Sequence, residues 1–358
     1  MKMKQKLIFT NQVGEAVDAL VAELGATGVT VITDTGAAEA VLPLLENDSQ
    51  AVAGATRIVV EAGDEHKNLE SLAGIWERLS ASEATRSGVV VNIGGGMVGD
   101  MGGFAAATFK RGMKCINVPT TVLAAVDASV GGKTGINFNG MKNQIGVFAE
   151  PVASVISTVY FNTLPAQEIL SGYAEMLKHA LLEGDGMLAK LLNYSPVYPE
   201  FDSEALLPLL RESVQVKERV VSADLTEQGI RKALNLGHTV GHAFESLALS
   251  RKSPVPHGYA VAWGMVVELV LSHMALRFPS DKLHRFADYV LKNYGVFSID
   301  CKDYPALMAA MRQDKKNDSP DKINFTLLHD AGQPEIDCTV SEDDIKSALD
   351  IYRDLAGI

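Results

Sequence analysis

The sequence predicts an α/β domain built on a parallel sheet, followed by a mainly α-helical domain. The length of 358 residues suggests two domains at about 150 residues each. In the first half, short runs rich in β-branched residues alternate with stretches of helical spacing, a pattern typical of a parallel sheet covered by helices. From about residue 166 onward, apolar residues recur mainly at helical spacing. We therefore expect domains at residues 1–165 and 166–358.

The expected strands of the first domain end at polar residues or glycines. They are VTVITDT (29–35), TRIVVEAG (56–63), GVVVNIGGG (88–96) and KCINVPT (114–120). The segment LESLAGIWERLSAS (69–82) has helical spacing. The hinge between the domains is expected near Asn162-Thr163-Leu164-Pro165.

Four long segments of the second half are expected to be helices, with one short β excursion, KINFTLLHD (322–330). The helices are expected within residues 166–184, 205–224, 234–249 and 258–278. The most apolar long segment, 258–276, includes Glu268 and His273, which favours a buried core helix over a membrane span.

Composition excludes several classes of protein. Hydrophobic residues make up 47% and the formal net charge is −12, so the chain can bury a core and is not intrinsically disordered. An acidic chain has no general attraction for nucleic acid or anionic membranes, so an anionic ligand needs a local basic cluster. The cysteines are widely spaced and odd in number, which indicates a reducing, cytoplasmic compartment; they are Cys115, Cys301 and Cys338. The N-terminal MKMKQKLIFT is too short in apolar residues for a signal peptide.

A glycine pattern follows the third expected strand. Gly94, Gly96 and Gly99 fit G-x-G-x-x-G, which permits a tight turn and close approach of a pyrophosphate to backbone N–H groups. The usual dinucleotide-binding pattern follows the first strand and has an acidic residue about 20 positions later. Here Asp100 follows at once, and Asp34 ends an earlier strand, where a ribose could be held. The pattern alone leaves open both nucleotide binding and a purely structural turn.

The segment PTTVLAAVDASVGGKTGINFNGMKNQIGVF (119–148) combines basic and amide side chains with glycines. Its polar residues of interest are Asp127, Lys133, Lys142 and Asn143, and Arg111 lies just upstream. Lysine and asparagine both donate hydrogen bonds, and glycines let the backbone close on a ligand, so the segment suits a phosphate site. A solvated flexible loop is the alternative, and the many small and apolar residues argue against it.

Carboxylate, histidine and basic residues recur at helical spacing in the second half. AEMLKHA places Glu175 and Lys178 three residues apart on one helical face. In RKALNLGHTVGHAFE, steps of four, three and four place a polar set on one expected helical face: Arg231, Asn235, His238 and His242. His257 follows in a Pro-His-Gly turn, and two or three histidines with a glutamate are the ligands of a catalytic zinc site. Spacing alone pairs His238 with His242 and also leaves open two structural histidines.

Together these motifs resemble the 3-dehydroquinate synthases of the sugar-phosphate cyclase superfamily, which is related more distantly to glycerol and iron-dependent alcohol dehydrogenases. The resemblance extends in order over residues 30–320. The motifs that carry it are GGGMVGD, PTTVLAAVDASVGGKTGIN, GMKNQIG, GYAEMLKHALL, ALNLGHTVGHAFE and PHGYAVAWGM.

The resemblance implies a lyase of the shikimate pathway, which leads to the aromatic amino acids. It would convert 3-deoxy-D-arabino-heptulosonate 7-phosphate to 3-dehydroquinate and phosphate by transient oxidation with NAD, β-elimination of phosphate, reduction, ring opening and aldol closure. The implied cofactors are NAD and one divalent metal, zinc or cobalt. The resemblance also implies a Rossmann-like NAD-binding domain, a helical domain that binds metal and substrate, a site in the cleft between them, and a cytoplasmic homodimer.

Carried over by position, the implied metal ligands are Glu175, His238 and His257. This replaces the pair that spacing alone suggests, and His242 becomes a substrate contact. The implied cofactor contacts lie along the whole first domain: Asp34, Asp64, Lys67, Gly95, Gly96, Met97, Asp100, Thr120, Thr121, Leu123, Asp127, Lys133, Lys142, Tyr160, Thr163 and Leu164. The implied substrate contacts and catalytic residues are Lys133, Asn143, Lys178, Lys217, Arg231, Asn235 and His242, with Arg111 and Lys315 or Lys316 near the phosphate.

Two departures from the family pattern touch the adenosine side of the cofactor. Asp64 stands where many members have Glu, and Gly36 where some have Asn. Other functions fit the residues less well. Another sugar-phosphate cyclase, such as 2-deoxy-scyllo-inosose or valiolone synthase, would not need the residues expected to bind a carboxylate. A polyol dehydrogenase would release NADH stoichiometrically. A non-enzymatic scaffold would have lost its ligands.

Overall fold

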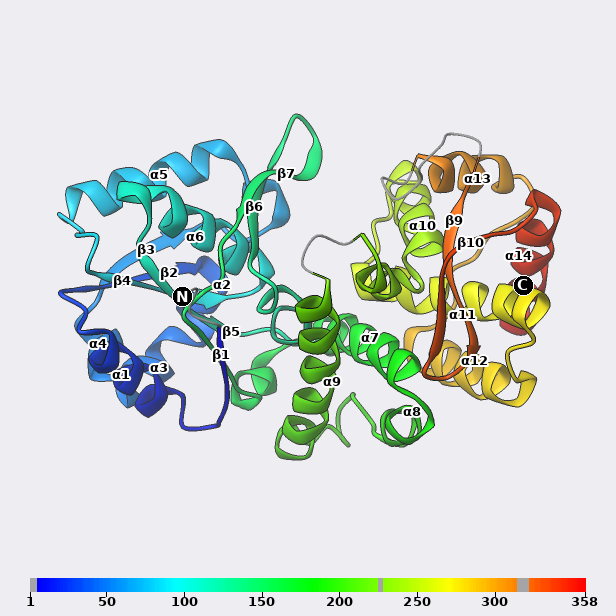
Figure 1. The fold of residues 1–358 in the computed structure, drawn as a ribbon, viewed down its shortest axis with the longest axis horizontal. Coiled ribbons are helices and arrows are strands. Elements are labelled where there is room, and N and C mark those ends of the chain that lie inside the picture. The colour runs from blue at the N-terminus through cyan, green and yellow to red at the C-terminus, as the bar shows by residue number, and fades with distance from the viewer. Residues whose placement is uncertain (1–4, 225–227, 314–321) are drawn as a thin grey trace. The chain divides into compact units, whose positions relative to one another are not determined.

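The computed structural model describes residues 5–224, 228–313 and 322–358, which form two compact units (Figure 1). The first unit comprises Met1–Pro165 and Asp202–Val214, and the second comprises Ala166–Phe201 and Gln215–Ile358. The chain therefore returns to the first unit at Asp202–Val214. The expected division at residue 165 did not predict this return. The returning segment is anchored there by hydrogen bonds, from Asn162 Nδ2 to Ser203 Oγ (3.1 Å) and from Arg211 to the Phe9 carbonyl (3.3 Å).

A six-stranded sheet forms the centre of the first unit, with the order β1-β8-β5-β4-β2-β3. Every neighbouring pair is parallel, as the alternation of strands and helices predicts. The strands are β1 (Lys6–Phe9), β2 (Val29–Asp34), β3 (Thr56–Val60), β4 (Val89–Gly94), β5 (Lys114–Pro119) and β8 (Ala153–Ile156).

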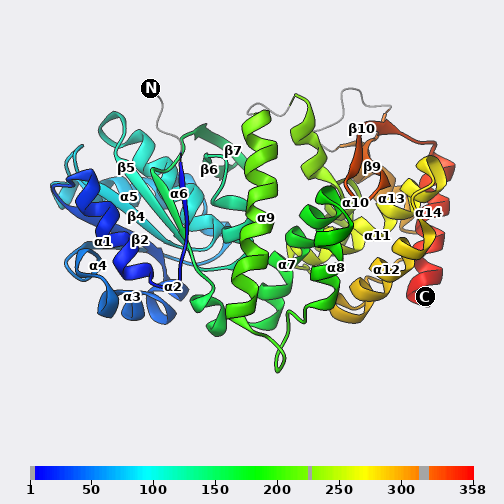
Figure 2. The same ribbon diagram turned by 60° about the horizontal axis from the view of Figure 1, so that its bottom comes forward.

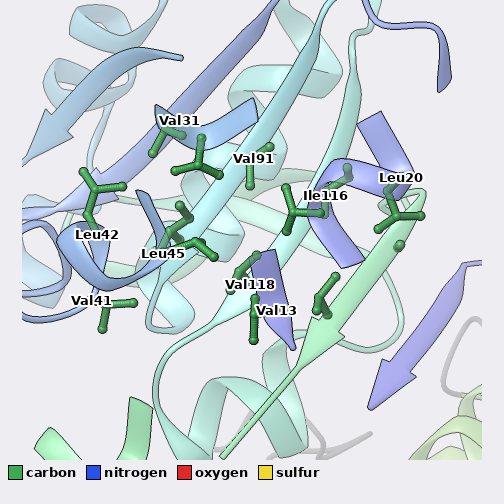
Figure 3. Packing of buried hydrophobic residues seen from close by; sticks show 14 of the residues in the cluster. Val13, Leu20, Val31, Val41, Leu42, Leu45, Val91, Ile116 and Val118 are labelled. Carbon is green, nitrogen blue, oxygen red and sulfur yellow. The ribbon is translucent and has the colours of Figure 1, made fainter. Parts of the chain in front are cut away.

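Helices cover both faces of this sheet because successive side chains of a strand point to opposite faces. Val31 and Val91 pack against α1 (Val13–Leu24), α3 (Leu42–Asp48) and α4 (Gln50–Ala53), as Figure 3 shows for part of this cluster. Their neighbours Ile32 and Val90 pack on the other face against α5 (Leu69–Ala81) and α6 (Gly96–Thr108). The expected Rossmann-like architecture is thus confirmed.

Short elements complete the first unit. They are α2 (Thr35–Ala40), the 3-10 helices η1 (Asp64–His66), η2 (Phe109–Arg111) and η4 (Val159–Thr163), and the π-helical turn η3 (Ala124–Ala128). Strands β6 (Lys133–Phe138) and β7 (Met141–Phe148) form an antiparallel hairpin (Figure 1). Asn139 and Gly140 join these strands with φ of 50° and 76°, as in a type I′ turn. The segment 119–148 is therefore mostly regular structure and not a loop.

The second unit is mainly helical, as expected. Its helices are α7 (Ala166–Glu183), α8 (Asp185–Asn193), the C-terminal part of α9 (Ser203–Ala223), η5 (Ile230–Asn235), α10 (His238–Ser250), α11 (His257–Leu276), α12 (Ser280–Tyr294), α13 (Tyr304–Arg312) and α14 (Glu342–Ala356). The expected β excursion is β9 (Asn324–Asp330), which pairs antiparallel with β10 (Gln333–Thr339). Figure 2 shows α7, α10, α12 and α14 around α11.

Helix α11 is the core of this unit. Among the described residues it is the one helix long and apolar enough to cross a membrane, yet 72% of its most apolar window is buried in the protein. Every residue from Gly258 to Ser272 except the partly exposed Tyr259 is buried, including Glu268. The expected core helix is therefore confirmed.

The expected single helical face from Arg231 to His242 is wrong. The segment forms the 3-10 helix η5 and then α10, separated by Leu236 and by Gly237 at φ 79°. The buried carboxylate of Glu268 accepts hydrogen bonds from Gly237 N (2.6 Å) and Val240 N (3.1 Å). This long-range contact satisfies the first N–H groups of α10 and fixes where the helix begins, which spacing within the segment cannot indicate.

The close contact of α10 with α11 predicts that one methyl group added at Gly264 destabilises the protein. A Cβ at Gly264 would lie 2.1 Å from the Gly237 carbonyl oxygen and 2.7 Å from Gly241 N. Gly264→Ala should therefore lower the free energy of unfolding by about 1–3 kcal/mol through overpacking, measured by urea denaturation. Gly186→Ala in α8, where a Cβ meets no atom within 4 Å, is the matched control and should not destabilise. Equal stability of the two variants would contradict this account.

Candidate nucleotide and metal sites

The carboxyl ends of β2 and β4 form the first candidate site. From β3 the chain crosses back over β2 to β4, so the strand order reverses between β2 and β4. Open parallel sheets bind ligands at such a point. Asp34 ends β2, and its Oδ1 accepts from Ala37 N (2.9 Å) at the start of α2. A Cβ at Gly94 would lie 2.5 Å from Val98 Cγ2 and 3.0 Å from Asp34 Oδ2, so this position requires glycine.

The glycine turn presents the N-terminus of α6 at this edge. Gly95, Gly96 and Met97 are partly exposed, and a small pocket beside them is lined by residues of β4, β5, α6 and η3. The backbone N–H groups at a helix N-terminus favour an anion such as a pyrophosphate. Thr120 N bonds the Gly94 carbonyl (2.9 Å), and a Cβ at Gly95 would lie 3.5 Å from Thr121. The turn thus brings Asp34, Gly95, Gly96 and Thr121 together.

The reason for glycine differs along α6. A Cβ at Gly99 would meet nothing within 4 Å, so packing does not require the last glycine of the G-x-G-x-x-G pattern. In contrast, a Cβ at Gly102 would lie 2.1 Å from Asn92 Oδ1, and one at Gly103 2.7 Å from Thr134. These two glycines let α6 approach the sheet and the hairpin. The pattern did not reveal them, because their partners are distant in sequence.

A buried lysine links three elements of the first unit. Lys67 is 4% exposed, and its Nζ lies 2.5 Å from Asp100 Oδ2 in α6 and 2.5 Å from Asn143 Oδ1 in β7. Nearby, Lys142 Nζ lies 3.5 Å from Asp64 Oδ2. The structure therefore gathers two expected cofactor residues, Lys67 and Asp100, around an expected substrate residue, Asn143.

The remaining expected residues of the first unit have varied positions. Leu123 precedes η3, Asp127 lies in it, Thr163 ends η4 and Leu164 follows it. Tyr160 is packed in the hydrophobic core, and burial raises the pKa of its phenol. Its carbonyl accepts from Thr163 Oγ1 (2.9 Å).

The basic residues expected near the phosphate are not all gathered. Lys133 is exposed at the start of β6. Arg111 is exposed and follows the C-terminal end of α6, about 12 Å or more along the helix axis from Asp100 at 1.5 Å per residue. The structure therefore does not place Arg111 beside Lys67 and Asn143. Lys315 and Lys316 lie outside the described residues.

The second candidate site is a set of three possible metal ligands within the second unit. Glu175 of α7, His238 at the start of α10 and His257 at the start of α11 each present a ligand atom within 4.8 Å of the others. Glu175 Oε1 lies 3.5 Å from His238 Nε2 and 3.7 Å from His257 Nε2. Ligand atoms of a tetrahedral zinc ion, each about 2.1 Å from the metal, are about 3.4 Å apart. The observed separations fit such an ion closely.

The surroundings of these atoms also fit a cation. Glu175 is 1% exposed; its Oε2 pairs with Lys178, and its Oε1 has no hydrogen bond within the described part of the chain. A buried carboxylate oxygen without a hydrogen bond is costly unless a cation is present. His238 Nδ1 lies 3.1 Å from the Leu236 carbonyl, which accepts its proton and leaves the Nε2 lone pair directed toward Glu175.

Glu245 is a residue that the sequence did not indicate. Its Oε2 lies 3.3 Å from His257 Nδ1, so the carboxylate accepts that proton and directs Nε2 toward Glu175. It also forms a second possible ligand group with His242 and His257. The sequence could have indicated Glu245 by its spacing. It lies three residues after His242 and seven after His238, on the same side of α10.

The pair of ligands suggested by spacing is not the one the structure favours. His238 and His242 stack edge to face, with ring centroids 5.4 Å apart. In the described residues, each is grouped with His257 as a possible ligand, not with the other. His242 lies beside the three-ligand set, with its ring 6.0 Å from that of His257.

Cationic side chains are buried in the same unit. Lys178, Lys217 and Arg231 are 2%, 6% and 3% exposed, which is rare for such groups. The backbone N–H of Arg231 donates to Asp224 Oδ2 (3.2 Å), which fixes the start of η5. Lys178 pairs with Glu175, so the carboxylate of the candidate metal site balances its charge.

Comparison with known proteins decides the family. Residues 57–171 match the family described as 3-dehydroquinate synthase N-terminal, and residues 172–317 match 3-dehydroquinate synthase C-terminal. The 3-dehydroquinate synthase of Parabacteroides distasonis is 45% identical over 360 residues, 99% of each chain. The chain belongs to the 3-dehydroquinate synthase family. The resemblance stated from the motifs is therefore confirmed, and so is the expectation of a phosphate-eliminating lyase.

Solved structures show the fold that this 3-dehydroquinate synthase family member shares with related cyclases. A 2-deoxy-scyllo-inosose synthase complexed with carbaglucose-6-phosphate, NAD+ and Co2+ has a TM-score of 0.83 at 24% identity and covers 97% of this chain and 96% of its own. The 2-epi-5-epi-valiolone synthase of Streptomyces hygroscopicus, with NAD+ and Zn2+ bound, has a TM-score of 0.83 at 24% identity and covers 99% and 98%. The expected fold class is confirmed.

The contact of Glu245 with His257 predicts its effect on metal binding in this family member. Glu245→Gln should weaken binding of Zn2+ or Co2+ by about 10- to 100-fold, because the orienting carboxylate is lost while the three ligands remain. Competition with a chromophoric chelator measures the affinity. Ser246→Ala, on the exposed side of the same helix, is the control. An affinity equal to that of the control would exclude an orienting role for Glu245.

Proposed function

We propose that this chain acts as a 3-dehydroquinate synthase, releasing phosphate from 3-deoxy-D-arabino-heptulosonate 7-phosphate and closing the carbocycle of 3-dehydroquinate. The observation that carries the proposal is the buried Glu175 Oε1, facing His238 and His257, in a chain 45% identical to a named relative. A buried carboxylate with two oriented histidines fits a catalytic divalent cation with open positions for substrate oxygens.

The proposed cofactors are NAD and a zinc or cobalt ion. Glu175, His238 and His257 would bind the metal, and the residues at the ends of β2 and β4 would bind the dinucleotide, with Asp34 toward the ribose and Gly95 and Gly96 toward the pyrophosphate. When bound, NAD supplies a reversible hydride acceptor and the divalent cation supplies Lewis acidity toward substrate oxygens. The related solved cyclases that contain NAD+ with Co2+ or Zn2+ support this assignment.

The buried cations of the second unit are proposed to bind the substrate carboxylate. Arg231 presents a planar fork of donors that matches a carboxylate, and Lys217 adds a second charge. Lys178 neutralises Glu175 and would donate to substrate oxygens near it. A cyclase whose substrate lacks a carboxylate has no need for this charge, which favours the heptulosonate over other sugar phosphates.

Neutral polar residues of the second unit are proposed to position substrate hydroxyl groups. The His242 ring lies beside His238 and His257, so it can hydrogen-bond a hydroxyl near the ligand set and hold its proton. Asn235 ends η5, the helix that also contains Arg231. The protein's contribution is then to hold one substrate conformer and to limit side reactions.

Lys133 and Asn143 are proposed to serve the phosphate, with Lys315 or Lys316. The Asn143 side chain is held by a hydrogen bond from Lys67, which fixes its direction. We propose in addition that the protein is a cytoplasmic homodimer with no nucleic-acid or membrane partner. The acidic net charge and the burial of α11 support the absence of these partners, and the free cysteines support a reducing compartment. The homodimer follows from the family resemblance alone.

One incubation tests the proposed function. The protein with the heptulosonate phosphate, zinc and NAD+ at one hundredth of the substrate concentration should release phosphate and form dehydroquinate in many turnovers per NAD+. Exhaustive chelation should abolish the reaction, and added Zn2+ or Co2+ should restore it, because the ligand set would then bind a cation again. Glu175→Gln should be inactive while folded. Stoichiometric accumulation of NADH, or full activity after chelation, would contradict the proposal.

Lys133→Ala separates phosphate binding from cofactor binding. Because the lost charge would act on the leaving phosphate, kcat should fall by about 100-fold. The dissociation constant of NAD+, measured by calorimetry, should change much less. Lys114→Ala, another exposed lysine of the first unit, is the control and should keep normal kinetics. Unchanged turnover in the Lys133 variant would remove this residue from the substrate contacts.

A further inference from the structure

The β6–β7 hairpin contains a bulge at the level of the expected ligand residues. Ile136 pairs with Ile145, and Phe138 pairs with Met141, so the single residue Asn137 lies opposite residues 142–144. Such a bulge interrupts the ladder and redirects side chains of the longer strand. Asn143 lies in this bulge with φ 51°, a left-handed conformation uncommon for residues other than glycine.

At the bulge, the side chain of Asn137 makes hydrogen bonds in place of the interrupted backbone ladder. Its Oδ1 accepts from Asn143 N (2.9 Å), and its Nδ2 donates to the Asp64 carbonyl (3.0 Å) and to Asp64 Oδ2 (3.2 Å). Its backbone N donates to the Lys67 carbonyl (2.8 Å). The side-chain amide therefore connects Asn143 to Asp64 of η1, and the backbone of the same residue connects the hairpin to Lys67.

The bond to Asn143 N has a direct consequence. With its backbone held in the left-handed conformation, Asn143 directs Oδ1 to Lys67 Nζ, which also binds Asp100. In regular pairing, successive residues would alternate between the faces of the hairpin, and this direction would be lost. The Asp64 contact has a second consequence, because it fixes the carboxylate that pairs with Lys142.

We propose that Asn137 is a positioning residue: it sets Asn143 for the substrate phosphate and Asp64 for the cofactor without contacting either ligand. The inference rests on the proposed function, which supplies the roles of those two residues. Closure of the hairpin does not depend on Asn137. The type I′ turn at Asn139-Gly140 and the pairs from Lys133↔Phe148 to Ile136↔Ile145 form independently of its side chain.

Two variants separate the two consequences. Asn137→Ala removes every side-chain bond, so NAD+ should bind about tenfold more weakly, and kcat should fall by about 10- to 100-fold. Asn137→Asp keeps the acceptor for Asn143 N but places a carboxylate against Asp64. It should weaken NAD+ binding about tenfold, with kcat close to that of the wild type. The control is Asn139→Gly, in the same hairpin at a positive φ that glycine tolerates.

The measurements are calorimetric NAD+ affinity and steady-state kcat and KM of the full-length, metal-loaded protein, with thermal unfolding to compare stability. A lower NAD+ affinity in both variants, with kcat lowered only in Asn137→Ala, supports the proposal. Values within twofold of the Asn139→Gly control overturn it. If Asn137→Ala does not fold, NAD+ binding by Asn137→Asp decides. A wild-type protein that releases no phosphate would overturn the proposed function, and the inference with it.

Discussion

The geometry of the second unit depends on the close approach of the α11 backbone to α7 and α10. A Cβ at Gly258 would lie 1.9 Å from the Ser171 carbonyl oxygen, and one at Gly264 would lie 2.1 Å from that of Gly237. Only glycine permits these distances. They bring His257, at the start of α11, beside the turn of α7 that carries Glu175, and they bring the start of α10 to the same place. The proximity of the three candidate metal ligands is a consequence of this backbone packing.

The buried carboxylate of Glu268 adds direction to that packing. By accepting from Gly237 N and Val240 N, it ends η5 and starts α10 at His238. His238 is therefore the first residue of α10, and at this position its Nδ1 can donate to the Leu236 carbonyl. An apolar residue in place of Glu268 would leave buried N–H groups without acceptors, which is costly. The hydrogen bonds of Glu268 thus determine both where α10 begins and how His238 is oriented.

Charge is distributed in opposite senses at the surface and in the interior. The chain carries −12 overall, yet Lys67, Lys178, Lys217 and Arg231 are all buried. Lys67 pairs with Asp100 and Lys178 with Glu175, so these cations also fix the carboxylates around them. The acidic net charge therefore does not prevent the chain from burying basic side chains, and carboxylates hold two of them in place.

The sequence by itself determined the elements and the chemistry of the candidate sites. Periodicity located four of the six parallel strands and the long helices, because hydrophobic spacing and turn residues are local properties of the chain. Spacing paired His238 with His242, and only the resemblance to the family indicated Glu175, His238 and His257 as ligands. Only the tertiary structure decided which atoms meet. The break at Gly237 depends on a carboxylate 31 residues away. The orientation of Asn143 depends on a bulge, and the return of Asp202–Val214 to the first unit depends on packing. Such contacts join residues that are separated by no regular interval, so the periodicity of the sequence cannot predict them.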